Sequence, residues 1–242
     1  MSGPFKTEAV VLRSIRFGEA DRVLHLYTAE RGRLGAVAKG VRRPRSRFGG
    51  RLEPFFRTRL VLHEGRGELC TVTSAETIHA HPALREHRGA LERAAEACDA
   101  VLRLFDAAEA NRPAYHLLCR ELALLDSQPA AATRAHGMAF RLKLALAAGF
   151  LPELAACATC GDSEHLAGFS ASAGGVVCGG CEGSSFPFAK EAHDFLTAAL
   201  ARPLAEAPEA PEPALRQADQ AIAETLEHHA HVRLRRLARS SA

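Results

Sequence analysis

The sequence lacks any long apolar run. No stretch approaches the roughly 18 apolar residues that a helix needs to cross a bilayer, and the first twenty residues do not contain the apolar core of a signal peptide. We therefore expect a cytoplasmic protein without a membrane partner.

Catalytic and phosphate-cradling motifs are also missing. The chain holds no G-x-x-x-x-G-K-[ST], H-E-x-x-H or G-x-S-x-G sequence, since Val41 follows Lys39 and Gly40. Glu19 and Asp21 lie close together, but no further acids stand at the spacing of a metal-dependent nuclease. We expect no catalytic residues and no enzymatic activity.

Acidic residues are scarce in the N-terminal third. Residues 1–80 hold 15 Lys and Arg against 8 Asp and Glu, a net charge of +7, whereas the remainder holds 16 against 20, a net of −4. The imbalance is sharpest in residues 31–59, where ten basic side chains accompany one acid, Glu53. Such clustering favours a polyanionic partner, and a nucleic-acid backbone is the commonest one.

The basic stretch supplies the predicted nucleic-acid contacts. Its phenylalanines are Phe48, Phe55 and Phe56, and of the adjacent pair at least one should point into a core. Phe48 lies among arginines and is the predicted platform for stacking a base. A merely solvated loop is the alternative for the arginines. The predicted DNA-binding residues are Arg33, Lys39, Arg42, Arg43, Arg45, Arg47, Phe48, Arg51, Arg57 and Arg59.

Short alternating apolar segments indicate a small sheet at the N-terminus. The expected strands cover residues 7–15, 22–27, 33–41, 55–63 and 68–78, and glycine-containing turns separate them. Five strands at this spacing fit a five-stranded OB-type barrel over residues 1–80.

From residue 81 onwards the apolar period becomes helical. Apolar positions recur every three to four residues in 91–105, 115–125, 138–148, 190–201 and 214–238. The fold class is therefore α+β with several domains. We expect a helical domain in two parts, residues 81–150 and 188–242, which residues 151–187 interrupt.

Four of the seven cysteines stand in two close pairs within that interruption. Cys157 and Cys160 are separated by two residues, as are Cys178 and Cys181, and 17 residues lie between the pairs. This spacing is typical of tetrahedral thiolate zinc, and redox-active thiols are the alternative. Because protein fills all four positions, we expect one structural Zn²⁺ per chain.

Several motifs together resemble the bacterial recombination mediator family RecO. They are residues 18–21 (GEAD), 39–43 (KGVRR), 52–55 (LEPF) and the four cysteines within a helical region. The resemblance implies an OB fold, a helical domain with a zinc-binding insertion, and no catalysis.

The resemblance also implies function and partners. RecO-like proteins bind single- and double-stranded DNA and anneal complementary strands. With RecR and RecF they help RecA replace single-strand DNA-binding protein, so a nucleoid-associated location is expected. Two alternatives stay open: an interaction adaptor without DNA contact, with the tail of single-strand DNA-binding protein on residues 84–150, and a zinc-containing RNA-binding module.

Overall fold

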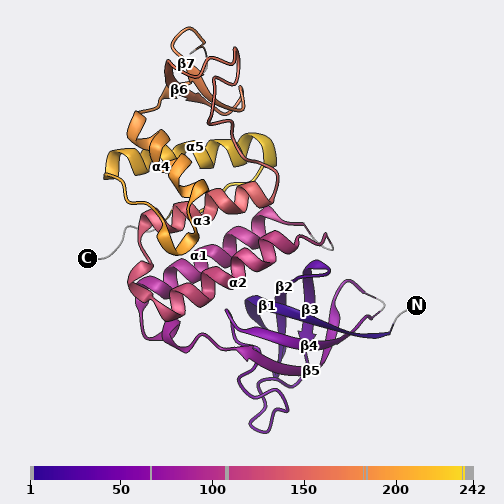
Figure 1. Ribbon diagram of the computed structural model, residues 1–242. Helices are drawn as coiled ribbons and strands as arrows, with labels where there is room; N and C mark the ends of the chain where they lie inside the picture. Colours follow the sequence, from indigo (N-terminus) through magenta and orange to yellow (C-terminus); the bar gives the residue numbers. More distant parts are fainter. Residues whose placement is uncertain are drawn as a thin grey trace. The chain divides into compact units, whose positions relative to one another are not determined.

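Five N-terminal strands close on themselves (Figure 1). The structure is a computed structural model that describes residues 3–65, 67–106, 109–181, 183, 185–235 and 237. The strand order is β1-β2-β3-β5-β4, and β4 pairs back onto β1. All neighbours are antiparallel except β3 and β5. This arrangement confirms the predicted OB-type barrel. The strands are β1 (Pro4–Phe17), β2 (Asp21–Thr28), β3 (Gly32–Ala38), β4 (Arg57–His63) and β5 (Cys70–His79).

Alternation along the strands fills the barrel. Leu24 and Leu26 of β2 point inward with Leu60 and Leu62 of β4, and all four are fully buried. The register of β1 against β2 shifts between Val11 and Arg13. Such a bulge changes which side chains face outward in the second half of the strand.

Two helices complete the first compact unit, Met1–Pro129. A short 3-10 turn, η1 (Pro82–Arg85), leads into α1 (Arg88–Leu104) and then α2 (Arg112–Ser127). Asn111 caps α2, because its side-chain oxygen accepts a hydrogen bond from Ala114 N at 3.0 Å. Tyr27 of β2 packs against Phe105 and Tyr115, with ring centroids 5.5 and 6.5 Å away. Aromatic packing thus joins this helical pair to the barrel.

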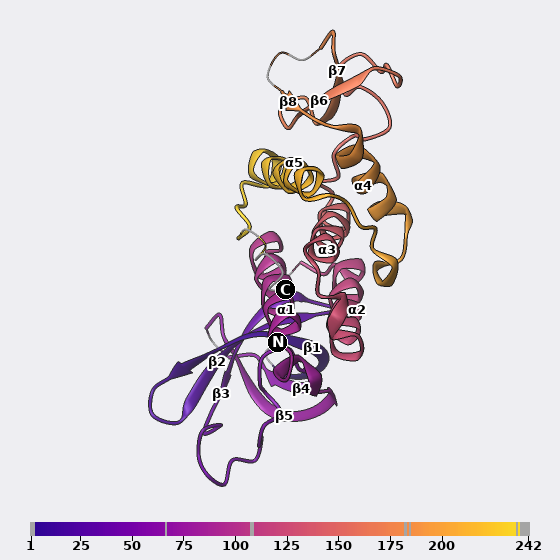
Figure 2. The ribbon, with the colours of Figure 1, turned by 90° about the vertical axis from the view of Figure 1, so that its left-hand side faces the viewer.

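The second unit, Ala130–Ala242, is built on three mutually packed helices (Figure 2). They are α3 (Arg134–Ala147), α4 (Lys190–Ala201) and α5 (Glu212–Ala230), with the turns η2 (Pro129–Ala131) and η3 (Leu204–Glu206). Helix α3 is buried on most sides, as its sequence predicted, and after its C-cap Ala148 the chain turns at Gly149, which has φ +81°. The boundary between the units falls inside residues 81–150, which the sequence had grouped together.

A small sheet lies between α3 and α4 in the chain. Strands β6 (Leu166–Ser170), β7 (Gly175–Cys178) and β8 (Phe186–Pro187) pair in the order β7-β6-β8. The sequence had not indicated these strands. The core of the sheet is aromatic: Phe169 packs against Phe186 and Phe188 with centroids 5.7 and 5.5 Å away.

Candidate nucleic-acid interface and thiolate cluster

The connection between β3 and β4, residues 39–56, carries most of the predicted DNA-binding residues and is called the basic loop below. Two of its side chains, Phe48 and Leu52, are each 1% exposed and belong to the barrel core. They anchor the loop at its middle, and Arg51 between them is exposed. The connection is therefore a folded part of the barrel.

Hydrogen bonds also fix both ends of the basic loop. Asp21 at the start of β2 accepts from Gly40 N at 2.7 Å through its Oδ1, and Ala20 O accepts from Arg42 N at 2.9 Å. Glu53 pairs with Arg22 at 3.0 Å. Thus the GEAD, KGVRR and LEPF motifs meet at one end of the barrel. Asp21 thus helps to fix the start of the basic loop.

Six predicted contact residues remain exposed on the basic loop. Arg47 donates to Val72 O at 3.5 Å, and its guanidinium lies 4.8 Å from the Phe48 ring centroid. Arg51 donates to Arg47 O and Phe48 O at 3.2 Å. These contacts orient the side chains but do not neutralise them. Within the described part of the chain, no carboxylate pairs with Lys39, Arg42, Arg43, Arg45, Arg47 or Arg51.

Three predicted contact residues are engaged elsewhere. Arg33 donates to Leu102 O at 2.5 Å. Arg57 pairs with Glu8 at 2.7 Å, and Arg59 bridges Glu8 and Glu76 at 3.1 and 3.2 Å. The hydrogen bond from Arg57 keeps the pKa of the Glu8 carboxyl below its ordinary value, against the effect of burial. Ion pairs therefore compensate the charges of Arg57 and Arg59 on the β1–β4–β5 side of the barrel, unlike those of the six loop cations.

The position of Phe48 contradicts its predicted role as a stacking platform. Its ring is 1% exposed and packs in the barrel core, so it offers no face on which a base could stack. Its position among arginines suggested exposure, but the apolar ring enters the barrel while its polar neighbours stay in water. Phe48 is an anchor of the loop and not a contact.

Two exposed cations of β1 were not among the predicted contact residues. Arg13 and Arg16 are exposed, and Arg13 stands opposite His25 of β2. They escaped notice because they lie outside residues 31–59. The available signal was the position of Arg13 on the same face of the strand as Ile15 and Phe17, with Arg16 on the opposite face.

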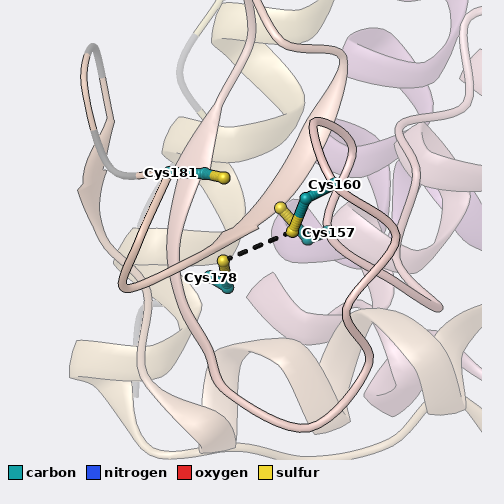
Figure 3. A group of neighbouring side chains, drawn as sticks. All are labelled: Cys157, Cys160, Cys178 and Cys181. Atoms are coloured by element: carbon teal, nitrogen blue, oxygen red, sulfur yellow. Dashed lines mark hydrogen bonds between the residues drawn. The ribbon is translucent and has the colours of Figure 1, made fainter.

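The four predicted metal ligands come together in the small sheet (Figure 3). Cys157 and Cys160 lie on the turn before β6, whereas Cys178 ends β7 and Cys181 follows it. All four Sγ atoms lie within 4.8 Å of one another, and those of Cys160 and Cys178 are 3.6 Å apart. Ideal tetrahedral coordination with bonds of about 2.3 Å places sulfur atoms about 3.8 Å apart, so this thiol set fits a tetrahedral metal ion.

Backbone hydrogen bonds close the two cysteine turns and stabilise the thiolate of Cys157. Each Cys-x2-Cys turn is closed by a hydrogen bond, from Gly161 N to Cys157 O at 2.8 Å and from Cys181 N to Cys178 O at 2.9 Å. Backbone N–H groups of Cys160 and Cys178 lower the pKa of Cys157 to about 6, because they stabilise its thiolate. All four cysteines are free of disulfides, and together they could hold a metal ion.

Comparison with known proteins agrees with this architecture. Models of the N-terminal and C-terminal domains of recombination protein O match residues 1–81 and 91–238. DNA repair protein RecO of Rubrobacter xylanophilus is 38% identical over 212 residues, which cover 84% of this chain and 83% of that protein. RecO of Anaeromyxobacter dehalogenans is 36% identical over 245 residues, 95% and 92%. RecO of Bifidobacterium animalis subsp. lactis is 42% identical over 176 residues, 72% of each.

An OB-type barrel with a cationic loop, followed by helices that carry a four-thiol cluster, defines a class of barrel proteins with a helical extension. Among the described helices, none has the length and apolar character of a transmembrane segment. The chain belongs to the recombination protein O family, as its motifs predicted. Its role accordingly lies in DNA repair and recombination.

Proposed function

We propose that the protein binds single- and double-stranded DNA through the basic loop, without sequence preference. The observation that carries this proposal is the set of six exposed cations that pair with no carboxylate among the described residues, on a loop that Phe48 and Leu52 hold in place. Guanidinium and ammonium groups gain affinity from phosphates by charge pairing and counterion release. Such contacts position a backbone and read no sequence.

Strand annealing is the activity that this surface supports best. Two complementary strands repel each other through their phosphates, and a row of guanidinium groups lowers that repulsion. Contacts to the backbone leave the base edges free to pair. We propose that the protein acts in this way as a mediator and not as an enzyme, and that it works with RecR and RecF so that RecA replaces single-strand DNA-binding protein.

The helical region is the proposed place of protein partners. We expect the tail of single-strand DNA-binding protein to dock on residues 84–150. The support for this placement is that helices α1, α2 and α3 of this region are rich in apolar side chains. DNA binding would place the assembly at the nucleoid.

The proposed metal is one structural Zn²⁺ held by Cys157, Cys160, Cys178 and Cys181. Four thiolates complete a tetrahedral shell, so no position is left for water or substrate. The ion would supply folding free energy to the small sheet, on the order of 10 kcal/mol.

A charge-matched pair of variants tests DNA binding. The loop variant replaces Arg42, Arg43, Arg45 and Arg47 by Ala. The control removes the same number of charges from helices and their flanks, at cations that already pair with acids: Arg88, Arg103, Lys190 and Arg233. We expect the loop variant to bind DNA of any sequence more weakly, with a salt slope smaller by roughly 0.7 for each lost contact to single strands.

The control variant should bind like the original chain. Equal losses in both variants would mean that net charge alone governs binding. Unchanged affinity in the loop variant would place the DNA site elsewhere. Circular dichroism and thermal unfolding of each variant establish that folding is preserved.

A further inference from the structure

The outer face of β1, β2 and β3 carries an unexplained apolar strip. Leu24 and Ala36 pair across β2 and β3 inside the barrel, so their strand neighbours point outward. On that outer side, Ile15 pairs with Val23, and Val23 pairs with Val37. Phe17 continues the same row of β1 towards the β1–β2 turn. Apolar side chains thus cross three strands on the outside of the barrel.

Exposure of this strip is unusual for the barrel. Among described residues of the first unit, the large apolar side chains that remain exposed are Phe17 at 56%, Leu69 at 41% and Ile15 at 39%. Leu69 belongs to the same face: a Cβ placed on Gly35 would approach its Cδ2 to 2.4 Å, and Gly35 points outward beside His25. All three exposed apolar side chains therefore lie on the outer face of the barrel: Ile15 and Phe17 are two residues apart on β1, whereas Leu69 lies in the row of Arg13, His25 and Gly35. Exposed apolar side chains gathered on one face mark an interaction site.

The charges around the strip select the kind of partner. Arg13 stands at one end, and its positive charge, together with that of Arg33, lowers the pKa of His25 further than burial alone. At the other end, Lys39 directly follows β3 and leads into the basic loop. One acid also stands here: Asp21 is the cross-strand partner of Phe17, and its Oδ1 accepts a hydrogen bond from Gly40 N at 2.7 Å. An apolar strip with cations at both ends is complementary to a nucleotide, which joins a flat apolar base to an anionic phosphate.

We infer that Phe17, with Ile15 beside it, forms a base-stacking platform for single-stranded nucleic acid on the outer face of β1–β2–β3. The inference rests on the proposed DNA binding and adds a second component to it. The basic loop holds phosphates of either single or double strands, whereas the platform needs unpaired bases, because duplex bases are stacked on each other. The platform therefore favours single strands over duplex.

Replacement of Phe17 by Ala tests the platform with three probes: an oligothymidylate, an abasic oligomer of equal length, and a duplex. Stacking of one base on an aromatic ring predicts a roughly 5- to 100-fold loss of affinity for oligothymidylate. Affinity for the abasic oligomer and the duplex should stay within about twofold, with the salt slope unchanged. Leu146→Ala, at an exposed apolar residue of the second unit, is the matched control and should change none of these affinities.

A spectroscopic readout is independent of affinity. The sequence contains no tryptophan, so Phe17→Trp introduces a single indole. Its fluorescence should be quenched by oligothymidylate and unaffected by the abasic oligomer, whereas Leu146→Trp should respond to neither.

Four results would separate the possibilities. Unchanged oligothymidylate affinity in Phe17→Ala would overturn the platform, as would an equal loss for the oligothymidylate and the abasic oligomer. Unchanged DNA affinity with loss of self-association or of a protein partner would assign the face to a protein and also overturn it. Failure of the unaltered chain to bind any probe would contradict the proposed function itself.

Discussion

At the scale of single residues, the basic loop has two kinds of side chain: those that anchor it in the barrel core, and the exposed cations that we propose contact DNA. Phe48 and Leu52 were hidden within a stretch whose composition indicates an exposed connection, and only their burial identifies them as core. Sequence could predict that the loop is cationic. It could not predict which arginines pair with acids, because Arg57 and Arg59 meet Glu8 through strand pairing between distant segments.

The anchoring role of Phe48 leads to a stability prediction. Phe48→Ala removes a fully buried ring from the barrel core, which typically costs about 3–5 kcal/mol of unfolding free energy. Phe17→Ala removes an equally large ring that is 56% exposed, and we expect a change of about 0.5 kcal/mol or less. Urea unfolding of the two variants measures both values. Equal stability losses would show that Phe48 does not anchor the loop.

His81 gives the protein a predicted sensitivity to acid. Its ring is 2% exposed, and its Nδ1 donates to Phe55 O at 2.8 Å. Burial, with a further contribution from His79, lowers the pKa of His81 from 6.5 to about 4. Between about pH 4 and 6.5, His81 of the unfolded chain therefore binds a proton, whereas His81 of the folded chain stays neutral. Stability is retained above about pH 6.5 and falls as the pH drops towards 4, by on the order of 3 kcal/mol.

The variant His81→Asn isolates this effect. Asparagine tolerates the left-handed backbone of residue 81, where φ is +48°, and its amide does not titrate. Between pH 6.5 and 4, we expect the unfolding free energy of the variant to fall less steeply than that of the original chain, by about 1.4 kcal/mol per pH unit. Parallel pH profiles of the unfolding free energy in the two proteins would exclude His81 as the source of the acid sensitivity.

At the scale of elements, periodicity predicted the long segments and failed on the short ones. The barrel strands and the helices of residues 190–201 and 138–148 were recognisable because several turns or alternations repeat within each. Strands β6, β7 and β8 have only five, four and two residues, too few to show a period. Helix α5 ends at Ala230 and not at 238, because His231 adopts a left-handed conformation with φ +54°.

The spacing of the cysteines, by contrast, predicted a cluster that the fold assembles. Its chemistry can be tested by native mass spectrometry, which should show a mass increase of roughly 63–65 Da per chain, one zinc less two protons. Chelation should remove the adduct and raise hydrogen exchange in β6 and β7, while the barrel strands keep their protection. A chain that lacks the adduct and whose exchange ignores the chelator would contradict a structural metal.

At the scale of the whole molecule, charge separates along the chain. The first 80 residues carry a net charge of +7 and the remainder −4. The first compact unit contains the barrel and the basic loop, whose six exposed cations pair with no carboxylate among the described residues. The sequence predicted this segregation and the family. It could not indicate the apolar strip around Phe17, because a strip across three strands exists only once the register of β1, β2 and β3 is set.

The salt dependence of DNA affinity tests the central claim most directly. With about five phosphate contacts on a single strand, the logarithm of the association constant should fall against the logarithm of salt concentration with a slope of roughly −3.5. A titration over several salt concentrations, with the unaltered chain and an oligothymidylate, measures it. A slope near zero, with affinity independent of salt, would contradict the account.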